Sequence, residues 1–395
     1  MLVQRPIRQQ RDGYGQPDAE AVGPELPAGK GGGHTAQAST HFAMEWGGVL
    51  GCLQWAAWQV LAVLVSLPLA MSLLVQFIIS PRKVLHHKDR SNLLLPDPLP
   101  GLLHQWIEAQ PGVKLHIART SRGSGKPLML LVHGFPEAWF TWAKQMADFR
   151  DQYEVVAVDM RGYGESSKPK GWLSYHQYHL ADDLLAVTEH LLQESGQKQV
   201  VLAGHDWGGH MCWCLAYMAP HLFSHLITLC VPHPGLYHKN RDLTQRIRHS
   251  YVLAFQLPWL GEAALCVNDY ALLESVLVNG PGGCNPGTVS QEYIERYKQA
   301  FGRPGVPTAA LNYYRAVNNA LFPTEKLHRL LAGKLLVPTL MLWGGRDINL
   351  SQVLLRDTDK HVDRLRVEVL PDSSHWMLQD CPAEVNRLMR DFLQA

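Results

Sequence analysis

The chain has 395 residues, which allows either two or three domains or one large α/β domain with an appendage. Hydrophobic residues make up 46% and charged residues 18%, a composition that excludes wholesale disorder. The 36 Lys and Arg residues balance 35 Asp and Glu residues, so net charge gives no reason to expect nucleic-acid binding. Seven cysteines without a CxxC pair argue against a zinc site and against a dense disulfide framework.

The N-terminal part predicts a membrane anchor. Residues 1–43 are rich in Gly, Pro, Gln and Ala without an apolar period, and we expect them to be disordered. Residues 46–80 carry no charge, and about 20 apolar residues suffice to cross a bilayer. A cleavable signal peptide has a shorter apolar region of about 7–15 residues. We therefore expect an uncleaved transmembrane helix, with Trp55 and Trp58 at its membrane interface.

The charges that flank this segment predict its orientation. Glu45 precedes it and the nearest upstream cation is Lys30, whereas four cations follow it closely, namely Arg82, Lys83, Lys88 and Arg90. Positive charge concentrates on the cytosolic side of a single span. We expect a single-pass protein of the endoplasmic reticulum whose residues 81–395 lie in the cytosol and contact membrane lipid.

From about residue 95 to residue 395, short apolar runs alternate with helical stretches. Continuous runs of Val, Leu and Ile indicate strands buried on both faces, and helices between them indicate a mostly parallel, twisted sheet. The expected strands are Lys114–Thr120, Leu128–His133, Glu154–Asp159, Gln199–His205, Leu226–Val231, Leu336–Trp343 and Arg366–Leu370. Residues 235–331 lack such runs and are expected to form a helical cap inserted into the sheet domain.

One turn carries the clearest chemical signal. The strand that ends at His205 runs into the sequence Gly204-His205-Asp206-Trp207-Gly208-Gly209, where small residues permit a sharp strand-to-helix turn. That turn is the nucleophile elbow usually written GxSxG, which occurs nowhere in this chain. Asp206 stands in the place of the serine. A carboxylate that attacks a saturated carbon gives a stable alkyl ester and needs no base to be ionised. The elbow therefore favours an epoxide or an alkyl halide as substrate.

Three further segments complete a constellation. His133-Gly134-Phe135-Pro136 follows a strand, so the N–H of Phe135 can form an oxyanion hole with that of Trp207. Asp347 follows another strand, and His375 follows the last one. The chain order of nucleophile, acid and histidine is that of the α/β-hydrolases.

These motifs, together with the turn Asp159-Met160-Arg161-Gly162-Tyr163-Gly164-Glu165-Ser166, resemble the epoxide hydrolase branch of the α/β-hydrolase fold over residues 95–395. Within that family the chain is most similar to the membrane-anchored types numbered three and four in mammals. The resemblance implies two cap tyrosines that donate hydrogen bonds to the epoxide oxygen, and it places them at Tyr251 and Tyr314, with Tyr313 the competing position. It also implies a substrate pocket lined by His133, Pro136 and Trp139, and no metal or organic cofactor.

Other activities remain open at this stage. A haloalkane dehalogenase shares the Asp elbow but has no need of two cap tyrosines. A fluoroacetate dehalogenase would be expected to carry Arg where Trp207 stands. A catalytically silent membrane-tethered binding protein would not need the full set of site residues. Trp139 and Trp142 are expected either to line the pocket or to pack in the core, and Cys212 and Cys214 to pack in the core.

The orientation is testable in sealed microsomes. Because cations concentrate after the apolar segment, added protease should digest residues 81–395. Detergent-opened microsomes provide the control. Protection of the catalytic part, or a glycan on Asn349 in its Asn-Leu-Ser sequon, would place that part in the lumen instead.

Overall fold

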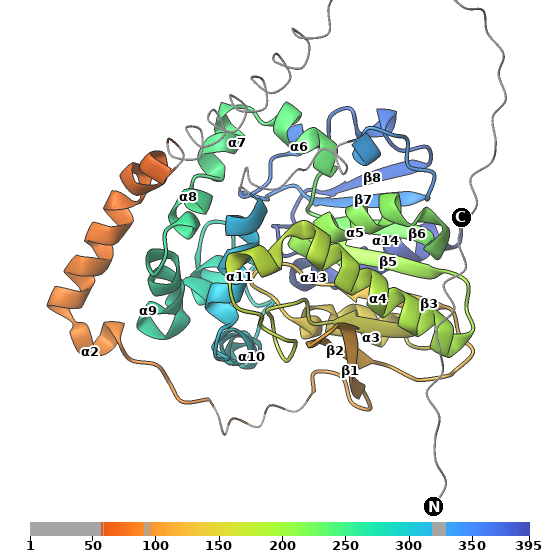
Figure 1. Ribbon diagram of the computed structural model, residues 1–395, viewed down its shortest axis with the longest axis horizontal. Coiled ribbons are helices and arrows are strands. Elements are labelled where there is room, and N and C mark those ends of the chain that lie inside the picture. Colours follow the sequence, from red (N-terminus) through yellow and green to blue (C-terminus); the bar gives the residue numbers. More distant parts are fainter. Residues whose placement is uncertain (1–56, 58, 91–92, 94, 96, 318–328) are drawn as a thin grey trace, which may run out of the picture. The chain divides into compact units, whose positions relative to one another are not determined.

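The computed structural model describes residues 57, 59–90, 93, 95, 97–317 and 329–395, all within one compact unit of residues 51–395 (Figure 1). The expected disorder of residues 1–43 and the interfacial roles of Trp55 and Trp58 fall outside the described residues and stay predictions.

An eight-stranded sheet forms the centre of the described chain, in the order β1-β2-β4-β3-β5-β6-β7-β8. The first two strands are antiparallel to each other, β2 is antiparallel to β4, and all other neighbours are parallel. The strands are β1 (Leu103–Gln110), β2 (Val113–Arg119), β3 (Leu128–Val132), β4 (Glu154–Val158), β5 (Val200–His205), β6 (Phe223–Leu229), β7 (Thr339–Gly344) and β8 (Leu365–Leu370).

Alternate residues of the central strands pack into two separate hydrophobic cores, one on each face of the sheet. In β3, Leu130 belongs to the core that packs against α4 (Gln177–Ser195) and α5 (Asp206–Met218). Its neighbours Met129 and Leu131 belong to the core against α3 (Ala143–Phe149) and α14 (Pro382–Leu393). This double burial explains why β3, β4 and β5 are uninterrupted apolar runs. Helices thus cover both faces of the mostly parallel sheet, as expected.

The segment between β6 and β7 is helical, as the lack of strand patterns predicts (Figure 1). It forms the cap over the carboxyl ends of the strands. Its helices are α6 (Pro234–Asn240), α7 (Leu243–Arg248), α8 (Tyr251–Gln256), α9 (Leu260–Glu274), α10 (Gln291–Phe301) and α11 (Val306–Val317).

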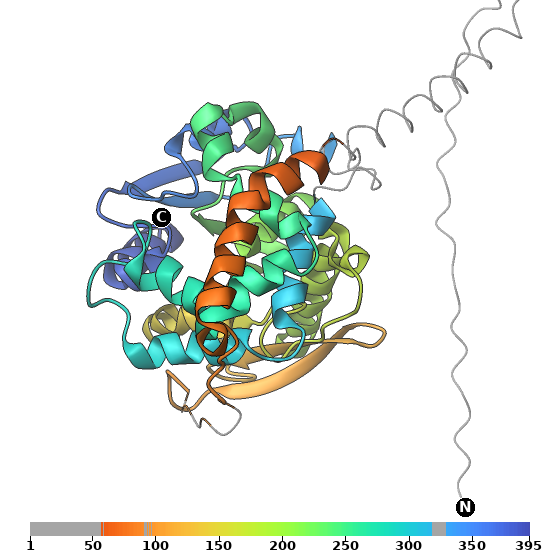
Figure 2. The same cartoon turned by 90° about the vertical axis from the view of Figure 1, so that its left-hand side faces the viewer.

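Ahead of the sheet domain lies the helix Gln59–Ile79, which is long and apolar enough to cross a membrane. Its outward side chains are mostly exposed and apolar, whereas Ala62 and Ser66 are buried. The short helix α2 (Pro81–Val84) follows it and packs against α9. Figure 2 shows the apolar helix, in orange, in front of the body.

The sequence prediction missed one strand. β1 pairs with β2 through a turn at Pro111 and Gly112, where Gly112 has a φ of 76°. β1 is an edge strand with an exposed Trp106, so it lacks the apolar run by which the other strands were identified. The Pro-Gly pair before Val113 was the available signal of a hairpin.

Candidate active site

The nucleophile elbow is present in the structure. Asp206 follows β5 directly, begins α5 and has a φ of 49°, in the left-handed region that non-glycine residues rarely adopt. Strain of this kind persists only where the surroundings enforce it, and it commonly marks a functional site. The turn holds the carboxylate at the carboxyl end of the sheet, beneath the cap.

Close backbone approach accounts for the glycines around Asp206. A Cβ on Gly134 would lie 2.4 Å from the Cβ of Asp206, and one on Gly208 would lie 2.3 Å from the carbonyl oxygen of Val132. The elbow and the loop after β3 can therefore touch only because both positions lack a side chain. This contact brings the Phe135 N–H to 2.9 Å from Oδ1 of Asp206, and the Phe135–Pro136 peptide is cis.

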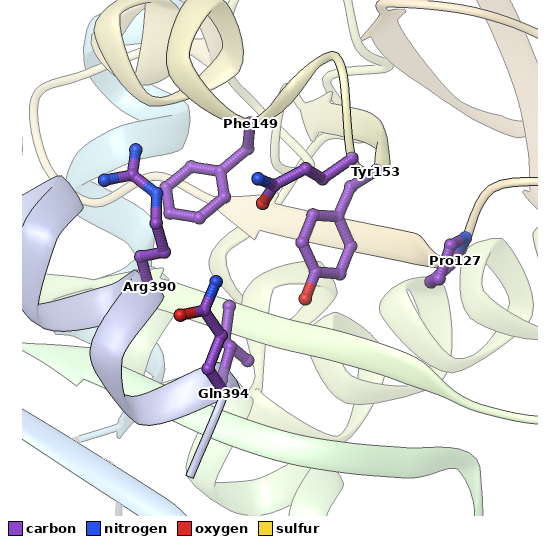
Figure 3. Close-up of a pocket in the computed structure, with 7 residues that line it drawn as sticks. Pro127, Phe149, Tyr153, Arg390 and Gln394 are labelled. Carbon is purple, nitrogen blue, oxygen red and sulfur yellow. The ribbon is translucent and has the colours of Figure 1, made fainter.

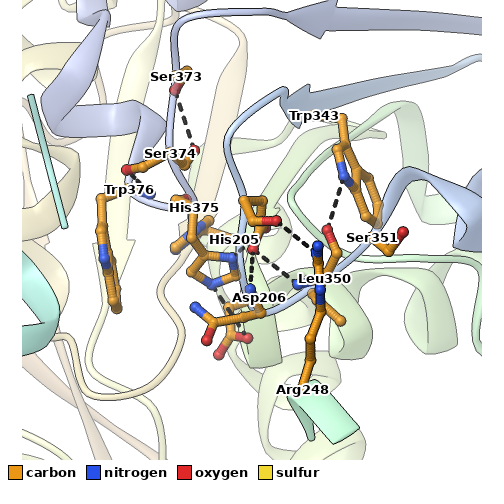
Figure 4. A network of polar contacts seen from close by, with 12 residues as sticks. His205, Asp206, Arg248, Trp343, Leu350, Ser351, Ser373, Ser374, His375 and Trp376 are labelled. Carbon is orange, nitrogen blue, oxygen red and sulfur yellow. Dashed lines mark hydrogen bonds and ion pairs between the residues drawn. The ribbon is translucent and has the colours of Figure 1, made fainter. Parts of the chain in front are cut away.

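The other oxygen of the same carboxylate faces a histidine (Figure 4). Nε2 of His375 lies 3.6 Å from Oδ2 of Asp206, and its Nδ1 lies 2.7 Å from Oδ2 of Asp347. The second oxygen of Asp347 accepts hydrogen bonds from the backbone N–H groups of Asn349 and Leu350 at 2.7 and 2.8 Å. Three residues far apart in sequence therefore form one line of carboxylate, imidazole and carboxylate, joined by a hydrogen bond to Asp347 and an ion pair with Asp206.

Asp206 and His375 in this line shift each other's pKa values toward the ionised forms. Burial would raise the pKa of Asp206, but His375 and the Phe135 N–H outweigh burial and lower that pKa to about 2. Burial opposes the imidazolium of His375, yet Asp347 and Asp206 together raise its pKa well above the usual range. The resting site thus holds an ionised Asp206 beside a protonated His375 at neutral pH.

The cap brings both expected tyrosines over the elbow. The ring of Tyr314 lies 5.3 Å from that of Phe135, 5.2 Å from Trp207 and 6.5 Å from Tyr251, measured between centroids. The hydroxyl of Tyr313 instead donates to the carbonyl of Arg161 at 2.6 Å. Burial, and then nearby negative charge that includes Asp206, raise the pKa of Tyr251 and Tyr314, so both phenols stay protonated.

Two residues expected to line the substrate pocket have other neighbours in the structure. Nδ1 of His133 donates to the carbonyl of Gly134 at 2.8 Å, and its Nε2 accepts from the N–H of Met160 at 3.0 Å. Both nitrogens bind backbone and the ring is fully buried, so His133 holds the loop after β3 in place. Trp139 lines a cavity of about 140 Å³ with His104 and His116, which does not include Asp206. Pro136 is buried beside Phe135, and Trp142, Cys212 and Cys214 are core residues.

A buried ion pair holds together the loops that carry the site residues. The sequence analysis did not assign this pair. Nδ1 of His205 lies 2.7 Å from Oε2 of Glu137, and Nε2 of His205 lies 2.9 Å from the carbonyl oxygen of His375. Both partners can only accept, so both nitrogens donate and His205 is an imidazolium. Burial disfavours this charge, but Glu137 outweighs it and raises the pKa of His205 to about 10. Glu137 also accepts from the Gly134 N–H at 3.0 Å.

The pair thereby joins the oxyanion loop, the residue before the nucleophile and the loop of His375. The sequence signal for this pair was the position of its two members. Glu137 directly follows the motif that ends at Pro136, and His205 directly precedes Asp206 at the end of an apolar strand. Charged residues are rarely found fully buried unless they are paired.

Among the described residues, one trio of metal-ligating side chains gathers within 4.8 Å, comprising His205, Cys230 and His375. The ring nitrogens of His205 already bind Glu137 and a backbone carbonyl, and Nδ1 of His375 binds Asp347. This donor set is arranged for hydrogen bonding and does not fit a metal ion.

A pocket of about 130 Å³ lies far from this chemistry. Figure 3 shows Pro127, Tyr153 and Arg390 around it. Pro127 directly precedes β3, so the pocket sits at the opposite end of the sheet from Asp206.

Comparisons with known proteins agree with the fold and with these motifs. A sequence profile described as the alpha/beta hydrolase fold matches residues 127–380. Human epoxide hydrolase 4 is 34% identical over 309 residues, covering 76% of this chain and 81% of that protein. Epoxide hydrolase 3 of Xenopus tropicalis is 35% identical, covering 72% of this chain and 75% of that protein.

Solved structures of epoxide hydrolases share the fold of this chain. The epoxide hydrolase of Bacillus megaterium in complex with an inhibitor superposes with a TM-score of 0.63 at 27% identity, covering 74% of this chain and all of that one. An epoxide hydrolase from Vigna radiata gives a TM-score of 0.64 at 29% identity, covering 74% of this chain and 98% of that one. The chain is thus an α/β hydrolase by fold. More particularly, it belongs to the epoxide hydrolase family.

The Glu137–His205 pair gives a pH-dependent stability prediction. Glu137→Gln leaves His205 buried without its counter-charge and should lower the free energy of unfolding at pH 7 by about 3 kcal/mol. The folded-state pKa of His205 is raised, so its contribution is complete below the unfolded value of about 6.5 and is lost as pH rises through about 10.

The loss of stability relative to wild type should therefore be greatest at about pH 6.5, shrink steadily as pH rises toward 10 and be small above pH 10. Thermal unfolding in detergent would measure it. Glu189→Gln, on the exposed side of α4, is the control and should match wild type. A loss of equal size at neutral and alkaline pH would contradict the ion pair.

Proposed function

We propose that this chain hydrolyses lipophilic epoxides to vicinal diols through an alkyl ester on Asp206. The observation that supports this most is the environment of one carboxylate. One oxygen of Asp206 accepts the Phe135 N–H and the other lies 3.6 Å from His375. An ionised carboxylate at an elbow, with a histidine beside it and protonated phenols above it, suits attack on a strained ether better than attack on a carboxylic ester.

In the first half-reaction, Asp206 attacks one epoxide carbon and forms a C–O bond as the ring C–O bond breaks. The electrons of that bond go to the departing oxygen, which takes a proton from Tyr251 or Tyr314. An alkoxide is too basic to leave unaided, so a phenol that stays protonated at neutral pH is a suitable proton donor. The product of this step is a hydroxyalkyl ester of Asp206.

In the second half-reaction, His375 acts as the base. Esterification removes the negative charge of Asp206 that helps to hold His375 protonated, so the pKa of His375 falls and its Nε2 proton passes to the phenolate that the first step left behind. The neutral Nε2 can then accept a proton from water. Water attacks the ester carbonyl, and the N–H groups of Phe135 and Trp207 stabilise the oxyanion. Collapse of the intermediate releases the diol and restores the carboxylate. Asp347 fixes the tautomer and orientation of His375.

The substrate class follows from the helix Gln59–Ile79 together with the family. A membrane anchor favours epoxides that partition into lipid, including those of fatty acids. We infer an endoplasmic-reticulum location with the catalytic part in the cytosol, because positive charge follows the apolar segment.

The two half-reactions are separable by mutation. His375→Gln should still open the epoxide, because carboxylate attack needs no base, and should then accumulate the ester. Intact-protein mass spectrometry should find this variant heavier by one substrate molecule, with the added mass on the peptide that contains Asp206. Asp206→Ala is the control and should acquire no mass.

If His375→Gln binds epoxides but never gains mass, the covalent mechanism is wrong. If it gains mass from alkyl halides alone, the chain is a dehalogenase.

A set of tyrosine variants tests the assignment of the two cap tyrosines. Tyr251→Phe and Tyr314→Phe should each slow ring opening by about 10–100-fold, since general acids contribute about 10²–10⁴-fold and each tyrosine can partly replace the other. The double variant should lose nearly all activity.

Tyr313→Phe removes only the hydrogen bond to Arg161 and should retain ring opening with reduced thermal stability. Single-turnover rates would measure all four variants. A Tyr313→Phe variant as slow as Tyr314→Phe would refute the assignment.

A further inference from the structure

We propose that the cap carries a second membrane contact, an interfacial surface formed by α7 and the turn before α9 that inserts into an anionic lipid bilayer. We call this surface the cap rim and define it by Leu243, Arg246, Ile247 and Trp259. The proposal concerns how the catalytic domain sits on the membrane and does not depend on the chemistry proposed above.

The apolar residues of the cap rim are unusually exposed. Trp259 is 85% exposed, Leu243 72% and Ile247 64%. Leu243 and Ile247 are four residues apart on α7, so they lie on the same face of that helix. Tryptophan concentrates at membrane interfaces, and Trp259 stands at the turn that opens α9 with a φ of 64°. Single exposed apolar residues are ordinary, but three large ones within residues 243–259 of the cap favour a contact surface.

The opposite face of α7 is fixed to the catalytic body, which keeps the apolar face outward. Gln245 is fully buried, donates to the carbonyl of Asn349 at 2.7 Å and accepts from the N–H of Ser351 at 2.8 Å. Arg248 donates to the carbonyl of Asp347 at 3.1 Å. Leu243 and Ile247 therefore cannot turn inward without breaking these bonds.

The segment that follows the apolar helix ties the cap to the membrane. Arg90 donates to both carboxylate oxygens of Asp269 at 2.6 Å and to Glu295 at 3.1 Å. The N–H of Lys88 donates to the same Asp269 carboxylate at 3.0 Å. Arg90 is only 7% exposed, so this segment is a docked strap on α9 and α10 rather than a loose linker.

The strap limits how far the cap can move from the bilayer. Residues 80–88 separate the apolar helix from the docked Lys88, and nine residues span at most about 30 Å when extended. Gln76, near the end of the apolar helix, also accepts a hydrogen bond from Asn268 at 3.0 Å. Trp259 lies ten residues before Asp269 in the chain. The helical part of α9 up to Cys266 covers about 10 Å, and the backbone then leaves the helical conformation at Val267–Tyr270, where Asp269 binds the strap. The cap rim is thus held within reach of the lipid surface.

Charge favours an anionic lipid surface as the occupant. Arg246 is exposed between Leu243 and Ile247, and α2 adds Arg82 and Lys83 where the apolar helix ends. Most acidic groups near this region pair with cations, since Asp269 and Glu295 bind Arg90, Glu274 binds Lys298 and Glu262 binds Arg315. Asp242 is exposed and caps α7 by accepting the N–H of Gln245. An apolar face with interspersed arginines, tethered beside a membrane helix, is typical of an interfacial element.

Photo-crosslinking in vesicles tests this contact directly. Full-length protein carrying p-benzoylphenylalanine in place of Trp259 or Leu243 is reconstituted in phosphatidylcholine vesicles with and without phosphatidylserine. Leu336 provides the matched control, because it is 67% exposed and lies three residues before β7, at the end of the sheet opposite the cap.

Irradiation should crosslink positions 259 and 243 to phospholipid at least fivefold more than position 336, with higher yield when phosphatidylserine is present. Equal lipid yields at all three positions, or crosslinks to a second copy of the chain in place of lipid, would overturn the proposal.

A functional comparison uses variants that leave the catalytic residues intact. Leu243→Glu with Ile247→Glu should raise KM severalfold for an epoxide dissolved in the bilayer while leaving kcat and the turnover of a water-soluble epoxide unchanged. Leu336→Glu should change neither. If the double variant takes up the bilayer-dissolved epoxide as well as wild type does, the cap rim is not a lipid contact. Because the crosslinking needs no turnover, its result stands even if the proposed activity fails.

Discussion

The structure depends on one strained contact, the approach of the Asp206 carboxylate to the loop that follows β3. Asp206 adopts a φ of 49°, and its Oδ1 accepts the Phe135 N–H at 2.9 Å. This contact requires glycine at positions 134 and 208, where a Cβ would overlap neighbouring atoms. The conformation is costly by itself and is held by the parallel strands on either side and by the buried Glu137–His205 pair.

The same contact links the electrostatics of the site to its chemistry. Asp206 and Asp347 hold His375 protonated in the resting state, and His375 in turn keeps the nucleophile ionised. Neutralising Asp206 as an ester would remove one of the two charges and free His375 to act as a base. Burial and negative charge keep Tyr251 and Tyr314 protonated, as the proposed donor role requires. A single arrangement can therefore serve a nucleophilic step and a basic step in succession.

Most of the fold could be predicted because its strands are buried on both faces. The apolar runs of β3, β4 and β5 and the small residues around Asp206 are local signals, and they indicate both the sheet and the elbow. The edge strand β1 escaped prediction because half of its side chains face solvent. The surroundings of His133 and Trp139 also could not be read from the sequence, since the hydrogen bonds of the His133 ring to Met160 and of the Trp139 backbone N–H to Asp159 form only in the folded chain. The Glu137–His205 pair joins residues 68 positions apart, and only the folded chain brings them together.

The most direct test of the covalent account is a single turnover in ¹⁸O-enriched water with enzyme in excess over epoxide. If the ester forms on Asp206, the first diol takes its new oxygen from the carboxylate and carries no label, while the Asp206 peptide gains one ¹⁸O atom by mass spectrometry. If water attacks the epoxide directly, the label appears in the first diol and the Asp206 peptide stays unlabelled, which would contradict the account.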